Sequence, residues 1–121
     1  MYAYFWVFIG GGLGSICRYG IAHALSGYEL RFPWATFLAN ALACVVLGLL
    51  VGLSLNDQIP QARYRLMLMT GFCGGFSTFS TFSNETFLLF ETGQYFYALS
   101  NILASLLVCL GCIYLGIRLV H

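Results

Sequence analysis

Charged side chains are scarce in this sequence: aspartate, glutamate, lysine and arginine together make up 7% of its 121 residues. Ordinary soluble domains carry about 25%. Hydrophobic residues make up 60% of the chain instead, and the mean hydropathy is +0.86. The formal net charge is only +1, and no stripe of basic residues is present that would indicate a nucleic-acid partner. The composition predicts an integral membrane protein embedded in a lipid bilayer.

The residue clusters that carry catalysis or hold a tightly bound metal are also missing. No nucleophile, base and orienting group form a recognisable set, so we expect no enzyme. Five cysteines lie in apolar stretches, and Cys109 and Cys112 form a single C-x-x-C without a second pair or a nearby histidine. We interpret these thiols as small buried hydrophobic groups rather than as metal ligands.

Four stretches lack charged residues altogether: 1–17, 32–56, 66–84 and 92–117. A helix needs about 20 apolar residues to span the hydrocarbon of a bilayer. The second and fourth stretches are long enough alone, and the first and third are if they continue past Arg18 and Glu85. We therefore predict an all-α fold of four transmembrane helices, with residues 1–121 forming a single transmembrane domain and no soluble domain.

The third stretch contains an unusual segment, TGFCGGFSTFSTFSNE, at positions 70–85. Its glycines, Gly71, Gly74 and Gly75, each weaken a helix by roughly 1 kcal/mol relative to alanine. Their clustering predicts that the third helix is broken here. A break in hydrocarbon frees backbone carbonyl and amide groups, which is tolerated only where protein, water or an ion satisfies them.

The polar residues in the second and fourth predicted helices have two possible roles each, one structural and one in transport. Thr36 and Asn40 lie one turn apart, and the Asn40 amide either joins helices by hydrogen bonds or donates to a passing anion. Tyr97, Asn101 and Ser105 share one face of the last helix. They form either interhelical hydrogen bonds or one wall of a polar track through the membrane.

Two ionisable residues lie near the ends of the charge-free stretches. Arg18 either pairs with headgroups or helix carbonyls, or provides a fixed positive charge at a pore mouth. Glu85 is interpreted as a carboxylate in a water-filled vestibule, with a proton relay or gate as the other possibility.

The distribution of arginine gives only a weak preference for one orientation in the membrane. Arg63, Arg65 and Arg118 lie on one side of a four-helix protein, against Arg31 and Arg18 on the other. Four helices also enclose little space for a polar solute. We therefore expect a dual-topology, antiparallel homodimer.

Three segments carry a resemblance to a known family: GGGLGSICRY at 10–19, FPWATFLAN at 32–40 and GFCGGFSTFSTF at 71–82. With them, the chain resembles the small fluoride channels of the Fluc (CrcB) family over nearly its whole length. The resemblance implies two anion pores in the antiparallel dimer and a structural Na⁺ at its centre. By position, the main-chain carbonyls of Gly74 and Ser77 from both subunits would hold this ion.

The resemblance also implies which side chains line the pores. These are the amide of Asn40, the rings of Phe79 and Phe82, and a polar track of Ser80, Thr81, Tyr97, Asn101 and Ser105. Fluoride is small and strongly hydrated, so a pore must replace its water with hydrogen-bond donors, and aromatic ring edges are weakly positive. Conduction also requires binding weak enough to release the ion.

The function that follows is a passive fluoride channel in the inner cell membrane, which lets cytoplasmic fluoride leave and protects enzymes from it. A small proton-coupled multidrug exporter is the alternative, although it needs a carboxylate in the first helix and none is present there. A non-transporting assembly subunit is a third possibility, against which the polar track and the broken helix argue.

Overall fold

The computed structural model describes residues 2–121, and all regular secondary structure in this part of the chain is helical, with no strand. Three helices, α1 (Tyr2–Leu25), α2 (Trp34–Leu55) and α6 (Tyr95–Val120), are each long and apolar enough to cross a membrane. Four shorter elements connect α2 to α6: α3 (Ala62–Arg65), the π-helical segment η1 (Leu66–Cys73), α4 (Gly74–Phe76) and α5 (Phe79–Glu91).

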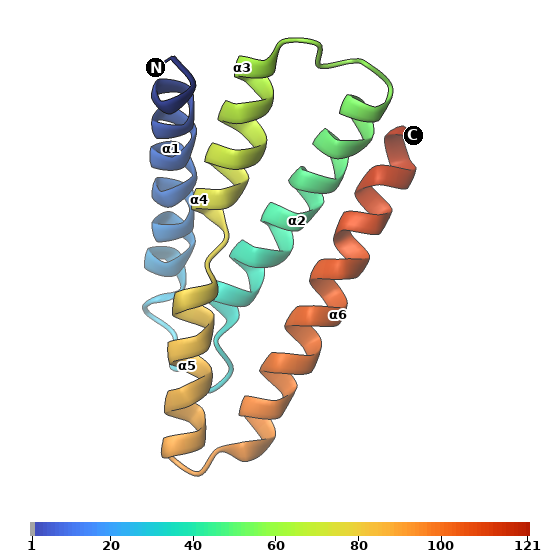
Figure 1. Ribbon diagram of the computed structural model, residues 1–121. Coiled ribbons are helices and arrows are strands. Elements are labelled where there is room, and N and C mark those ends of the chain that lie inside the picture. The colour runs from blue at the N-terminus through green and yellow to red at the C-terminus, as the bar shows by residue number, and fades with distance from the viewer. Residues whose placement is uncertain (1) are drawn as a thin grey trace.

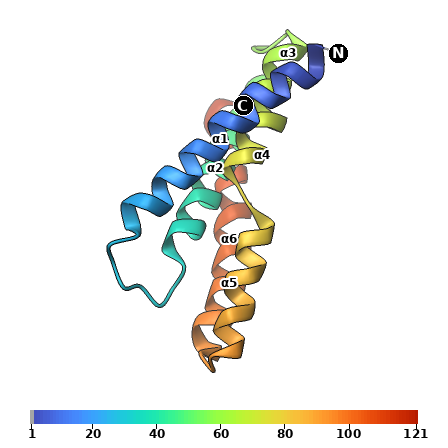
Figure 2. The same ribbon diagram turned by 90° about the vertical axis from the view of Figure 1, so that its left-hand side faces the viewer.

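The helices form two packed layers (Figure 1). In one, α2 and α6 run parallel side by side, and in the other α1 packs along the continuous helical stretch of α3, η1 and α4. Both chain termini and the α2–α3 loop lie at one end of the molecule, and the α5–α6 turn lies at the other. The view in Figure 2 shows that α1 and α5 diverge beyond α4, so that α5 contacts α6 rather than α1.

Glycines determine how closely α1 approaches the helical stretch before α5. A Cβ atom on Gly10 would collide with the Met67 carbonyl, and one on Gly14 would collide with backbone atoms of Phe72 and Phe76. Small residues at this four-residue spacing let helix backbones touch. Gly10 and Gly14 form such a GxxxG pattern and allow α1 to pack closely.

The prediction that glycines break the third helix is wrong about the position of the break. Gly71, Gly74 and Gly75 are all helical, and Gly74 has ordinary helical angles of −66° and −36°. A Cβ on Gly71 or Gly75 would clash with the backbone of α1. These two glycines are therefore needed for contact with α1, because packing outweighs their low intrinsic helix propensity.

A small apolar core lies where α1, α2 and α4 meet. Ala39 and Ala43 of α2 pack against Phe76, with Ile21 and Phe72 at its edge. The short alanine side chains let α4 lie close to α2. This contact places the last residue of α4 beside α2 and thereby positions the segment that follows it.

Candidate functional site

The helix is interrupted at two residues, Ser77 and Thr78, directly after the core residue Phe76. Their backbones are extended, with φ and ψ of −84° and 158° at Ser77 and −152° and 124° at Thr78. Helix α5 then begins at Phe79. The interruption thus follows the glycines by two residues.

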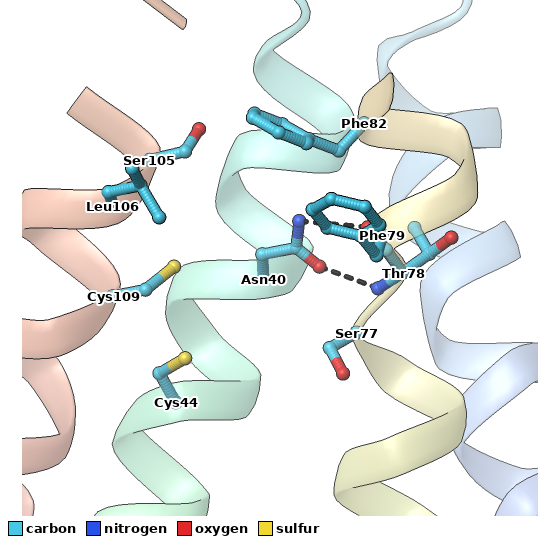
Figure 3. Close-up of a pocket in the computed structure, with 9 residues that line it drawn as sticks. All are labelled: Asn40, Cys44, Ser77, Thr78, Phe79, Phe82, Ser105, Leu106 and Cys109. Carbon is cyan, nitrogen blue, oxygen red and sulfur yellow. Dashed lines mark hydrogen bonds between the residues drawn. The ribbon is translucent and has the colours of Figure 1, made fainter. Parts of the chain in front are cut away.

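A side chain from α2 satisfies the backbone at this interruption. The Asn40 amide nitrogen donates to the Thr78 carbonyl at 3.2 Å, and the Thr78 backbone N–H donates to the Asn40 side-chain oxygen at 2.7 Å (Figure 3). The N–H and the carbonyl of Thr78 therefore both have a hydrogen-bond partner, although neither takes part in a helical hydrogen bond. This geometry matches the reading of Asn40 as a residue that joins helices. One hydrogen of its NH₂ group is not used in this pair, because the group has two donors.

Thr78 also caps the helix that follows. Its hydroxyl oxygen accepts the backbone N–H of Thr81 at 3.2 Å, and its hydroxyl lies 3.2 Å from that of Thr81 and 3.3 Å from that of Ser80. Threonine is a favoured N-cap residue for this reason. The sequence analysis missed Thr78, although a threonine directly before a helix-forming stretch is a recognisable N-cap signal.

A cavity of about 220 Å³ opens beside the interruption. Five residues singled out from the sequence line it, together with four that were not: Asn40, Ser77, Phe79, Phe82 and Ser105, and Cys44, Thr78, Leu106 and Cys109 (Figure 3). None of these side chains carries a formal charge. The cavity therefore combines amide and hydroxyl groups with aromatic and apolar walls.

The two phenylalanine rings lie next to one another at the mouth of this cavity. The ring centroids of Phe79 and Phe82 are 5.8 Å apart and the rings are inclined by 38°. Phe79 is 78% exposed in the single chain, whereas Phe82 is half-buried. Burial in the single chain therefore does not explain why a large aromatic side chain stands at position 79.

The polar residues of α6 divide into two groups. Asn101, which is 1% exposed, donates to the Thr86 hydroxyl at 2.9 Å, and Ser105 donates to the Asn101 side-chain oxygen at 3.1 Å. Thr86 in turn donates to the Phe82 carbonyl at 2.8 Å. These bonds connect α6 to α5, as the interhelical reading expects. Of the polar side chains Thr86, Asn101 and Ser105, only that of Ser105 also lines the cavity.

Tyr97 lies apart from the other predicted track residues on α6. It is half-buried and does not line the cavity, and its ring packs edge-on against Phe96 at 5.8 Å. The structure therefore brings Asn101 and Ser105 together with α5 but leaves Tyr97 outside this group.

Arg18 reaches the helical stretch from α1. Its Nε donates to the Gly75 carbonyl at 3.2 Å, two residues before the interruption. This bond agrees with the reading in which the arginine pairs with a helix carbonyl. The contact also connects α1 to the backbone that precedes the cavity.

Glu85 and Thr36 lie together towards the α5–α6 end of the molecule. The Glu85 side chain interacts with Thr36, and one of its carboxylate oxygens is buried without a hydrogen-bond partner among residues 2–121. Glu85 lines a second cavity of about 330 Å³, together with Arg31 of the α1–α2 loop. Thr36 is buried.

Two backbone carbonyls near the interruption lose the partners that a continuous helix would give them. The Thr78 N–H, which would bond the Gly74 carbonyl, goes to Asn40, and the Thr81 N–H, which would bond the Ser77 carbonyl, goes to the Thr78 hydroxyl. Carbonyl oxygens are suitable ligands for hard cations. Within residues 2–121, no group of three or more His, Cys, Asp or Glu side chains could hold a metal ion.

Comparisons with known proteins give a consistent result. The model of the family described as "CrcB-like protein, Camphor Resistance (CrcB)" matches residues 5–117. A protein of Pyrococcus abyssi named "Fluoride-specific ion channel FluC" is 46% identical over 108 residues, covering 89% of this chain and 87% of that protein. Proteins with the same name from Pyrococcus furiosus and Prosthecochloris aestuarii are 47% and 43% identical over 110 residues, covering 91% of this chain and 89% and 86% of theirs. The chain is a multi-pass membrane protein and belongs to the CrcB family.

Proposed function

We propose that this protein is a fluoride-selective channel of the inner cell membrane. It lets cytoplasmic fluoride leave down its electrochemical gradient and so lowers fluoride toxicity. The observation that carries the proposal is the uncharged cavity at the helix interruption, where an amide and hydroxyl groups lie beside two phenylalanine rings. The relatives named as fluoride-specific ion channels support the same ion.

The chemistry of this cavity suits a small, strongly hydrated anion. The free hydrogen of the Asn40 amide replaces water with a conventional donor. The rings of Phe79 and Phe82 add weakly positive edges. None of the residues that line the cavity carries a formal charge, so no cation in its wall would hold the ion too tightly for release.

The proposed architecture has four membrane-spanning segments. The third consists of two half-helices, α3–η1–α4 and α5, joined by Ser77 and Thr78. Ser80 and Thr81 at the start of α5, with Tyr97, Asn101 and Ser105 on α6, would form the polar track along the pore. Glu85 and Thr36 would lie in a vestibule at one end of it.

A second, inverted copy of the chain completes each pore in this proposal. Phe79 is 78% exposed, so the single chain leaves one wall of its pore open. The arginines at the two ends give little preference for orientation: Arg63, Arg65 and Arg118 lie at the end with the termini, and Arg31 lies at the other. An antiparallel dimer with a pore along each side follows from these two features.

Labelling of a cysteine introduced in one loop or the other tests this dual topology. Tyr28→Cys in the α1–α2 loop and Gln58→Cys in the α2–α3 loop report opposite ends of the molecule, in a background from which the exposed Cys17 has been removed. We expect a membrane-impermeant maleimide to label roughly half of the chains at each position, because the charge bias is weak. Full labelling at one loop and none at the other would refute the inverted copy.

We further propose a structural Na⁺ at the centre of the dimer, held by the Gly74 and Ser77 carbonyls of both chains. The diverted N–H groups of Thr78 and Thr81 support it, because they leave these two carbonyls available. A Cβ on Gly74 would meet nothing within 4 Å in the single chain, so this face is open to a partner.

Removal of sodium tests the central ion. With N-methylglucamine in place of Na⁺ throughout purification, we expect the dimer fraction on size exclusion to fall, because four carbonyl oxygens would face one another without a cation. Returning Na⁺ should restore the dimer. A dimer fraction that does not depend on Na⁺ would argue against this site.

Ion efflux from reconstituted vesicles tests the function itself. With a potassium gradient and valinomycin to set the potential, we expect rapid fluoride efflux and no chloride efflux above that of protein-free vesicles. Equal efflux of both anions would refute selectivity, and no efflux of either would refute the channel.

A further inference from the structure

Four of the five cysteines gather where α2, η1 and α6 meet. Cys44 of α2 lies close enough to interact with Cys73 of η1 and with Cys109 and Cys112 of α6, and all are free thiols. The fifth, Cys17, is exposed on α1. The sequence offered only Cys109 and Cys112 as a pair, whereas the fold brings together cysteines from three separate segments.

Cys44 and Cys109 form the central pair of this cluster. Their side chains lie near one another across the α2–α6 interface, and both line the cavity beside the helix interruption (Figure 3). The two helices approach closely because Gly48 and Gly116 pack backbone against backbone further along the same interface. The pair is therefore held by a rigid contact between two long helices.

Sulfur also lines the cavity on the other side of Cys44. A space of about 210 Å³ there is lined by Cys44, Cys73 and Met69, among other residues, so Cys44 borders two cavities. Thiolate and thioether sulfur are soft ligands, which select soft metal ions over Mg²⁺, Ca²⁺ or Na⁺. The thiol pair is thus accessible from the cavities and has a thioether nearby.

We propose that Cys44 and Cys109 form a two-thiolate site for a soft, two-coordinate cation of the Hg²⁺, Ag⁺ and Cu⁺ class. Structural zinc requires four protein ligands, and no group of three or more suitable side chains exists within residues 2–121. A linear ion needs only the two sulfurs that the helices present. The proposal does not depend on fluoride conduction.

Binding at this site involves proton release and no redox change. Each thiol gives its proton to water, and two sulfur–metal bonds form. With Hg²⁺ the two thiolates and the ion give a neutral unit, whereas with Ag⁺ or Cu⁺ the unit carries one negative charge. A buried charge is costly in an apolar interior, so Hg²⁺ is the best-matched probe.

The stoichiometry of mercury binding tests the proposal. In the variant Cys17→Ser/Cys73→Ala/Cys112→Ala, Cys44 and Cys109 are the remaining thiols. We expect one Hg²⁺ per chain to block both of them, as measured by the loss of thiols reactive towards a disulfide reagent in a dilute detergent solution of the reduced protein. Each added ion should then remove two thiols.

A matched variant keeps two cysteines that cannot share an ion. Cys44→Ala/Cys73→Ala/Cys112→Ala retains Cys17 on α1 and Cys109 on α6, two helices that lie on opposite sides of the bundle (Figure 1). It should require two Hg²⁺ per chain. If Cys73→Ala prevents folding, as shown by circular dichroism, Cys73 is retained in both variants and the expected difference of one ion per chain remains. Equal mercury requirements in the two variants would overturn the proposal.

Discussion

Phe79→Ile is expected to reduce fluoride efflux from reconstituted vesicles to the background of protein-free vesicles. The substitution removes the aromatic ring edge at the cavity beside the helix interruption while keeping a large apolar side chain. Because Phe79 is 78% exposed in the single chain, little packing is lost with it. Its contact with Phe82 contributes about 0.5–1.5 kcal/mol beyond buried area. Helix content and the dimer should therefore persist while transport is lost.

Phe96→Ile is the matched control for this result. Phe96 on α6 is also 78% exposed, but it does not line the cavity. We expect its replacement to leave fluoride efflux unchanged. Phe82→Ile should behave like Phe79→Ile, because both rings border the same space. Normal efflux in the Phe79 and Phe82 variants would remove these rings from the proposed pore.

Asn40→Leu is expected to cause a large loss of both thermal stability and fluoride efflux. It removes the donor and the acceptor that satisfy Thr78 at the interruption, with almost no change in side-chain size. An unsatisfied buried backbone group costs about 1–3 kcal/mol. We expect the variant to lose thermal stability and its fluoride efflux to fall at least about tenfold, which corresponds to 1.4 kcal/mol. Fluorescence-detected size exclusion after heating and the vesicle assay measure the two effects.

Asn40→Asp separates the structural role of Asn40 from its proposed role in the pore. Aspartate still accepts the Thr78 N–H, but it has no NH₂ donor and introduces a negative charge beside the proposed anion path. We expect this variant to keep more of its stability than Asn40→Leu and still to lose efflux. Asn84→Leu, at an exposed position on α5, should change neither property. Full efflux in Asn40→Asp would assign Asn40 to structure alone.

The position of the helix interruption could be predicted only approximately from the sequence. The glycines marked the right neighbourhood, but intrinsic propensity does not reveal that Gly71 and Gly75 face the backbone of α1. The partner that makes an interruption tolerable, Asn40, is 38 residues away in the chain. A long-range hydrogen bond of this kind leaves no local pattern beyond the presence of a polar residue in an apolar helix.

The candidate site could likewise be predicted only in part, because contacts between distant segments leave no local pattern in the sequence. Asn40, Phe79, Phe82 and Ser105 were identified from the sequence and do line one cavity. Tyr97 was grouped with Ser105 because their spacing puts them on one face of the helix, yet Tyr97 lies outside that cavity. Helical spacing shows which face two residues share, but not how far along that face a cavity extends.

By itself, the sequence determined that this is a helical membrane protein, because the scarcity of charge and the length of the apolar stretches leave few other folds. Its motifs carry the resemblance to the CrcB family, which the family model bears out. Tertiary structure decided where the third apolar stretch is interrupted, which donors satisfy the interruption and which cysteines meet. Those outcomes depend on contacts between residues far apart in the chain, since backbone groups that cannot bond to water must find whichever partner the packed helices place beside them.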